Sequence, residues 1–138
     1  MKKNVIEIPV DEYSSPIRFS ASPSMKVLEV SEIFDNNSIR HLPVLKANKP
    51  VGIISERDIF LLDKDSETQG KEISNFMKEN PFCVQSGTPL ESVAFEMSNR
   101  KIGSAIVIND RKEAEAIFTS IDGLNAIIEV LRGEFEAQ

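Results

Sequence analysis

One pattern of secondary-structure signals occurs twice in this chain, and the second copy follows the first at a nearly constant offset. Ile39 aligns with Ile102 at an offset of 63 residues, and Asp58 aligns with Asp122 at an offset of 64. The extra residue falls in a turn, where chains tolerate insertions. The register indicates an internal duplication and restricts the fold to two similar units. The other pairs in register are Val27 with Leu90, Val30 with Val93, Phe34 with Met97, Gly52 with Ala116 and Ser55 with Thr119.

Each half of the chain has the pattern strand, helix, strand, strand, helix. In the first half, two β-branched runs at 43–45 and 51–54 flank a polar turn at 47–50, which predicts a hairpin. One such unit of about 60 residues buries little apolar surface, so it is marginal alone, whereas two units can share a core. We expect an α+β fold of two β-α-β-β-α repeats related by a pseudo-two-fold axis, with the small sheets packed together and the helices outside.

Several local features are also predicted. Residues 17–21 favour a short strand, and Ser22 or Ser24 is expected to cap the first helix. In the second half, Thr88 is expected to cap a helix that has Pro89 at its first position. The last helix carries the apolar residues Ile121, Leu124, Ile127, Ile128 and Leu131.

The duplication predicts the domain limits. We expect an N-terminal arm at 1–14, a first repeat at 15–68 and a second repeat at 69–138. The arm alternates weakly, and Pro9 would confine it to a sheet edge. A docking arm and a loose leader both fit this pattern.

Bulk composition excludes several classes of protein. The 138 residues carry 16 basic and 22 acidic side chains, a net charge of −6, which argues against nucleic acid as the main partner. No apolar run approaches the roughly 20 residues of a membrane helix, and no secretory signal is visible. The single Cys83 cannot form an internal disulfide. We therefore expect a cytoplasmic protein that binds neither membrane nor nucleic acid.

A hydroxyl and a carboxylate stand three residues apart at each predicted joint between the second hairpin strand and its helix. These are Ser55 with Asp58 and Thr119 with Asp122. A hydroxyl at a helix start can donate to a phosphate oxygen, aided by the helix dipole, and the carboxylate can accept from ribose hydroxyls. The same spacing also makes a capping box, which is purely structural. The two roles can coexist.

Basic side chains adjoin the first of these joints. His41 is the only histidine, and it is either a phosphate ligand beside Arg57 or a solvated turn residue. Arg40 can add positive charge. Arg57 in the first helical turn opposes the helix dipole, which favours a ligand role over an exposed ion pair. A lone histidine is a poor metal ligand and lacks a nucleophile beside it, and the chain has no GxxxxGK[ST], CxxC or HExxH motif. We expect neither a metal site nor an enzyme.

With these motifs placed, the chain resembles a tandem pair of CBS (cystathionine β-synthase) domains, a Bateman module of the stand-alone type. The resemblance rests on four segments, 38–43, 51–58, 101–107 and 117–122, and on the lead-in at 76–81. It implies a regulatory, non-catalytic module that binds AMP, ADP or ATP, or as secondary alternatives S-adenosylmethionine or NAD, in clefts between the repeats. It also implies a homodimer and an effector protein, whose identity the sequence does not give.

The adenine of such a ligand needs an apolar slot. The candidates are Ile17, Phe19, Ile39 and Leu42 in the first repeat and Phe82, Val84, Ile102 and Ala105 in the second, and plain core packing is the alternative for each. The second repeat has Gly103 and Ser104 where the first has Arg40 and His41, with Ser104 as its polar candidate. We expect the first site to prefer phosphate-rich ligands and the second to be weaker or empty. The competing function is a ligand-free dimerisation or docking module.

Overall fold

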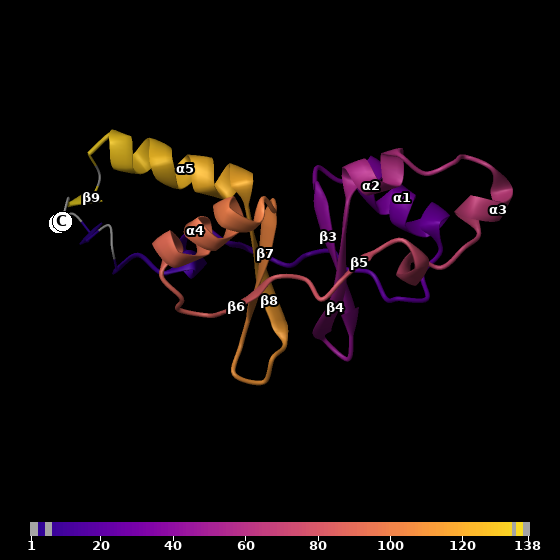
Figure 1. Cartoon of the computed structure of the whole chain (residues 1–138), viewed down its shortest axis with the longest axis horizontal. Coiled ribbons are helices and arrows are strands. Elements are labelled where there is room, and N and C mark those ends of the chain that lie inside the picture. Colours follow the sequence, from indigo (N-terminus) through magenta and orange to yellow (C-terminus); the bar gives the residue numbers. More distant parts are fainter. Residues whose placement is uncertain (1–2, 5–6, 134, 137–138) are drawn as a thin grey trace. The chain divides into compact units, whose positions relative to one another are not determined.

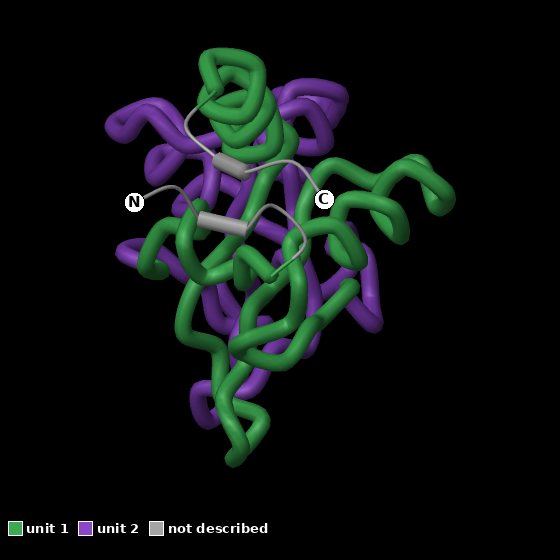
Figure 2. The backbone as a smooth tube through the Cα atoms, turned by 90° about the vertical axis from the view of Figure 1, so that its left-hand side faces the viewer, with its two compact units in different colours: residues 1–17, 82–138 green, residues 18–81 purple. Residues whose placement is uncertain are grey.

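Two antiparallel hairpins, one in each half of the chain, organise the fold (Figure 1). They are β3 (His41–Lys46) with β4 (Lys49–Ser55) and β7 (Ser104–Ile108) with β8 (Ala114–Thr119). The computed structural model describes residues 3–4, 7–133 and 135–136. It divides into two compact units, residues 18–81 and residues 1–17 with 82–138 (Figure 2). The predicted α+β class and both predicted hairpins are confirmed.

The unit formed by residues 18–81 is built on the first hairpin. Ala47 and Asn48 make its turn with positive φ angles of 51° and 64°, a conformation that suits a two-residue hairpin loop. β5 (Lys78–Glu79) extends the sheet beside β4. The helices are α1 (Val27–Asn36), α2 (Glu56–Phe60) and α3 (Ser66–Gln69), with a 3₁₀ turn at Ile73–Asn75. The buried core comprises Ala21, Val27, Val30, Phe34, Leu42, Val44, Ile54, Ile59 and Ile73.

The other unit contains a four-stranded sheet in the order β2-β8-β7-β6. β2 (Ser15–Pro16) pairs antiparallel with β8, whereas β6 (Cys83–Gln85) pairs parallel with β7. The helices are α4 (Leu90–Arg100) and α5 (Ser120–Leu131). Its core comprises Val10, Val84, Val93, Met97, Ala105, Val107 and Phe118. A further short pair, β1 (Lys3–Asn4) with β9 (Phe135–Glu136), joins the two terminal segments in parallel.

The N-terminal segment packs in the unit that contains the C-terminal half. Val10, in the 3₁₀ turn Val10–Glu12, is fully buried, and its amide donates to Thr88 O at 2.8 Å. The carboxylate of Asp11 accepts from Ser86 Oγ at 2.6 Å and from Gly87 N at 2.7 Å. Val5 and Ile6 of the expected arm lie outside the described residues. The compact units thus differ in their limits from the proposed divisions 1–14, 15–68 and 69–138, which describe the sequence duplication.

Both predictions of helix caps are wrong. Helix α1 begins after Lys26 rather than after Ser22 or Ser24, and its first amide, of Val27, donates to Lys71 O at 2.9 Å. Helix α4 begins at Leu90 with Pro89 as its N-cap, and Leu90 N donates to Ile8 O at 2.8 Å. Thr88 Oγ1 donates instead to Gln85 O at 2.6 Å. Carbonyls from distant segments satisfy these helix starts, so no hydroxyl cap is needed there.

The expected strand at 17–21 is also wrong. Only Ala21 pairs with the hairpin, as an isolated parallel bridge to Val44. Its amide donates to Pro43 O at 2.9 Å, and its carbonyl accepts from Leu45 N at 2.8 Å. The two residues before it, Phe19 and Ser20, are exposed, so this stretch has no face that a longer strand would bury.

Candidate ligand site

Ser55 and Asp58 hold the joint between β4 and α2 in a reciprocal pair of hydrogen bonds. Asp58 N donates to Ser55 Oγ at 3.0 Å, and Ser55 N donates to Asp58 Oδ2 at 2.9 Å. This geometry confirms the predicted capping box. The box uses the serine oxygen only as an acceptor. The hydroxyl proton of Ser55 and Oδ1 of Asp58 take part in no hydrogen bond within the described part of the chain, so a ligand can still use them.

His41 lies opposite Ser55, because the two residues are paired across β3 and β4. Directly opposed residues project from the same side of a sheet. Nδ1 of His41 is buried, and among residues 3–4, 7–133 and 135–136 it finds no hydrogen-bond partner. Burial lowers the pKa of His41 below 6.5, with nearby Arg40 acting in the same direction and Asp58 opposing. A neutral imidazole with an unused nitrogen therefore stands beside the Ser55 hydroxyl.

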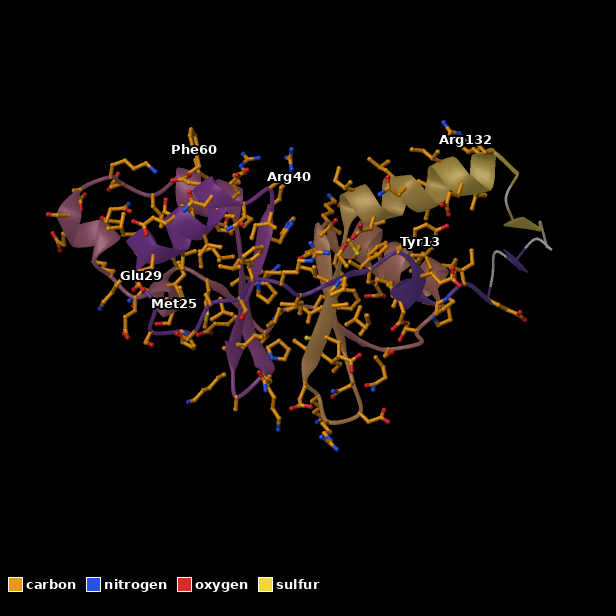
Figure 3. The ribbon with its side chains drawn as sticks, turned by 180° about the vertical axis from the view of Figure 1, so that it is seen from behind. Tyr13, Met25, Glu29, Arg40, Phe60 and Arg132 are labelled. Carbon is orange, nitrogen blue, oxygen red and sulfur yellow. The ribbon has the colours of Figure 1, made fainter. Side chains whose placement is uncertain are left out.

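Two exposed arginines flank this joint. Arg40 directly precedes β3, and its carbonyl accepts from Glu56 N at 2.8 Å, which ties the residue to the start of α2 (Figure 3). Arg57 lies in the first turn of α2, which has only five residues and hence a small dipole. No salt bridge occupies either guanidinium within the described residues. Positive charge near Ser55 thus comes from these side chains more than from the helix end.

The apolar candidates of the first repeat have three different environments. Leu42 is fully buried in the core of its unit, and the half-buried Ile39 packs against the same cluster. Phe19 is 39% exposed. Ile17 belongs to the other unit, where its amide donates to Glu115 O at 3.2 Å. The structure therefore gives Leu42 and Ile39 a packing role and does not gather all four residues in one unit.

The second joint repeats the backbone geometry of the first. Ser104 pairs with Thr119 as His41 pairs with Ser55. Ser120 N donates to Gly103 O at 3.2 Å, the counterpart of the bond between Glu56 and Arg40. Phe82 and Ile102 pack against the core of this unit. The duplication thus extends to single hydrogen bonds at the two joints.

The side-chain bonds of the two joints differ. Thr119 N donates to Asp122 Oδ2 at 2.8 Å, and the Thr119 hydroxyl donates to the same oxygen at 3.2 Å. The hydroxyl proton is therefore already committed to Asp122, whereas that of Ser55 is not. No basic side chain stands where His41 stands, because Ser104 occupies that position and is buried. The second joint offers a ligand fewer groups than the first.

Sequence reasoning missed one contact near Phe82. The guanidinium of Arg100 lies 4.8 Å from the centre of the Phe82 ring, within the range of a cation–π interaction. The two residues stand 18 positions apart, on α4 and just before β6, so no local spacing could have revealed the pair. This contact gives Phe82 a structural role besides its place as a ligand candidate.

The described residues contain no group of three or more His, Cys, Asp or Glu side chains placed to hold a metal ion. Burial raises the pKa of the Cys83 thiol, which keeps it in the less reactive protonated form. No helix in the described part of the chain has the length and apolar character needed to span a membrane.

Comparison with known proteins assigns the family. The model of the CBS domain matches residues 1–65 and 71–129. The chain belongs to the CBS domain family. Among solved structures, the CBS domain pair of protein MJ0100, in complex with 5′-methylthioadenosine and S-adenosyl-L-methionine, is 27% identical with a TM-score of 0.76, over 87% of this chain and 99% of that one. CBSX2 in complex with AMP is 25% identical with a TM-score of 0.79, over 90% of this chain and 98% of that one.

The matches to curated relatives cover only part of each relative. L-aspartate semialdehyde sulfurtransferase of Methanocaldococcus jannaschii is 30% identical over 121 residues, which are 87% of this chain and 23% of the relative. CBS domain-containing protein YhcV of Bacillus subtilis is 28% identical over 74 residues, 54% of this chain and 53% of the relative. The matched regions thus cover about a quarter and about half of these two relatives.

Proposed function

We propose that this chain is a regulatory CBS module that binds an adenosyl ligand, with the joint of Ser55 and Asp58 as its main contact. The observation that carries the proposal is the unused hydrogen-bonding capacity at this joint. Asp58 Oδ1 can accept from a ribose hydroxyl, and the Ser55 hydroxyl can donate to an anionic oxygen. The adenosyl ligands of the MJ0100 pair and CBSX2 support the same ligand class.

The basic side chains favour a phosphate-bearing ligand. Arg40 and Arg57 flank the joint, and guanidinium groups pair well with phosphate oxygens. His41 Nδ1 supplies an unused polar atom. The sulfonium of S-adenosylmethionine carries positive charge, which two arginines repel. We therefore rank AMP, ADP and ATP above S-adenosylmethionine.

The second joint serves as a weaker site or as a structural copy. Its threonine proton is bound to Asp122, and Ser104 replaces the histidine. Any ligand there must displace the bond between Thr119 and Asp122 before it can use the hydroxyl. The first-repeat site should fill first in a titration.

The module acts by binding and not by catalysis in this proposal. An adenosyl ligand changes the affinity of the homodimer for an effector protein, and the coupling is reciprocal. The second candidate function is a docking module without a small ligand, which the capping boxes favour, because they explain Ser55 and Asp58 without one.

Thermal unfolding separates the two functions. The protein is heated alone and with AMP, ADP, ATP, S-adenosylmethionine, 5′-methylthioadenosine or NAD, with inosine monophosphate as the control for the adenine ring. A bound ligand at 100 times its Kd stabilises the folded state by about 2.7 kcal/mol. We expect the largest shift with an adenine nucleotide. No shift with any of these compounds would leave only the docking module.

A further inference from the structure

A guanidinium covers the ring of Phe82 in the unit that contains the C-terminal half of the chain. Arg100 is the last residue of α4, and its guanidinium carbon lies 4.8 Å from the centre of this ring. The half-buried Phe82 also packs against the core of its unit. The aromatic surface that the core leaves free is therefore taken by a cation, which binds there by a cation–π interaction.

The duplication supplies an uncovered counterpart of this ring. At the offset of 63 residues, Phe82 corresponds to Phe19 and Arg100 corresponds to Asn37. Asn37 is the C-cap of α1, and its side-chain amide donates to Ile33 O of its own helix at 2.9 Å. Phe19 is 39% exposed. The first repeat thus leaves accessible an aromatic ring that the second repeat covers with a charged side chain.

The covered ring lies at the end of the sheet where the second joint stands. β6 and β7 are parallel and begin at that end, and the antiparallel β8 ends there with Thr119. Phe82 directly precedes β6, and its carbonyl accepts from Ile106 N at 2.9 Å. Phe82 and Thr119 thus flank β7, two strand spacings or roughly 10 Å apart. An adenosine with its ribose at Asp122 can span this distance.

We propose that Arg100 takes the place of an adenine ring on Phe82 and thereby closes the second joint to adenosyl ligands. Planar cations and nucleobases compete for the same aromatic face, because both stack on its π-system. The hydroxyl of Thr119 is likewise bound to Asp122. Groups of the chain itself thus occupy both ends of the second site. The inference rests on the proposed function and deepens it, because it names the residue that makes the two joints unequal.

Arg100 is a cover that can be removed without opening the core. Its side chain is 53% exposed, and its Nε lies 3.9 Å from Oε2 of Glu96. Exposed ion pairs of this kind contribute little to folding stability. Substitution of Arg100 should therefore leave the fold intact and change the accessibility of the Phe82 ring.

Calorimetric titration with adenosine tests this inference. Adenosine carries the adenine and the ribose without the phosphate charge that Arg100 would also attract. The background is Asp58→Ala, which weakens the first joint so that the second joint dominates the signal. On this background, Arg100→Ala should bind adenosine about 2- to 5-fold more tightly, the equivalent of one exposed cation–π contact.

Three control variants show whether the gain comes from the uncovered ring. Arg100→Lys keeps a cation at the end of α4 and should show no gain. Asn37→Ala changes the corresponding position of the first repeat and should show none either, because Asn37 bonds to its own helix. Asp122→Ala, added to the Arg100→Ala variant, should abolish the gain, because the ribose then loses its carboxylate. Circular dichroism establishes that each variant is folded, and Arg100→Gln replaces Arg100→Ala in the test if that variant does not fold.

The outcomes distinguish this inference from the proposed function. Unchanged or weaker binding of adenosine by the Arg100→Ala variant, or a gain that survives Asp122→Ala, overturns the role of Arg100. Failure of every variant to bind adenosine overturns it as well, whereas AMP binding by the wild type would still support the sensor. A gain in the Arg100→Ala variant of a protein whose wild type binds no adenosyl ligand would support the role of Arg100 and overturn the first joint as the main contact.

Discussion

Replacing Asp58 with alanine should separate ligand binding from helix capping. The variant loses the bond from Ser55 N at 2.9 Å and also Oδ1, which accepts no hydrogen bond from the described residues. Asp122→Ala is the matched control, because Asp122 accepts from Thr119 N at 2.8 Å in the same way. Loss of a cap costs about 1 kcal/mol of folding free energy, which both variants should share. Hydrogen bonds to a charged group are worth about 1.5–3 kcal/mol, so Asp58→Ala should weaken ligand binding by roughly 10- to 150-fold.

Isothermal titration calorimetry with the nucleotide that gives the largest thermal shift measures this effect. Differential scanning calorimetry of the same samples measures the loss of stability. We expect similar losses of stability in the two variants and a much larger loss of affinity in Asp58→Ala. Equal losses of affinity would refute the ranking of the two joints. Unchanged affinity in both variants would show that the carboxylates serve only as helix caps.

Three further predictions concern packing and pH. Gly52→Ala should destabilise the protein by about 1–3 kcal/mol, because the new Cβ would meet Met77 Sδ and lie 3.2 Å from Lys78 O. Gly123→Ala should stabilise the protein by up to about 1 kcal/mol, because its Cβ would meet only Phe118 Cζ, at 3.7 Å. Urea unfolding measures both changes, and the same sign for both variants would contradict the packing described. Tyr13→Phe removes the hydrogen bond to Glu129 and should cost about 1.5 kcal/mol, so an unchanged urea midpoint would show that the N-terminal segment is not held by this contact. The pKa of His41 is lowered in the folded state, so its contribution to stability is complete above the pKa of the unfolded chain, about 6.5, and is lost as pH falls through the lowered pKa. The free energy of unfolding of the wild type should therefore fall below pH 6.5 more steeply than that of His41→Gln. Parallel pH profiles of the two proteins would contradict this assignment.

The duplicated hairpins and helices could be predicted because their signals are local. Two β-branched runs on either side of a polar turn predicted β3 and β4, and the constant offset extended the prediction to β7 and β8. The helix starts could not be predicted in this way. Lys71 O and Ile8 O receive the first amides of α1 and α4, and neither acceptor is near its helix in sequence. The burial of Val10 likewise depends on a core that is formed by residues 84–118.

In the candidate site too, the local features could be predicted from the sequence and the side-chain contacts could not. The spacing of Ser55 and Asp58 predicted a capping box, and the box is present. The spacing could not reveal that the hydroxyl of Thr119 donates to Asp122 while that of Ser55 leaves its proton unused, because both sequences allow either rotamer. Nor could it show that Ile121, Leu124 and Leu131 of α5 are more than half exposed. Apolar periodicity identifies a face, but what covers that face is a property of the assembled fold.

A crystal structure of the protein with the nucleotide that stabilises it most would show whether the joint of Ser55 and Asp58 holds the ligand. We expect the ribose hydroxyls to lie within hydrogen-bonding distance of the Asp58 carboxylate and a phosphate oxygen to accept from the Ser55 hydroxyl. A nucleotide bound away from the β4–α2 joint, with Asp58 still accepting from Ser55 N as it does here, would contradict this assignment.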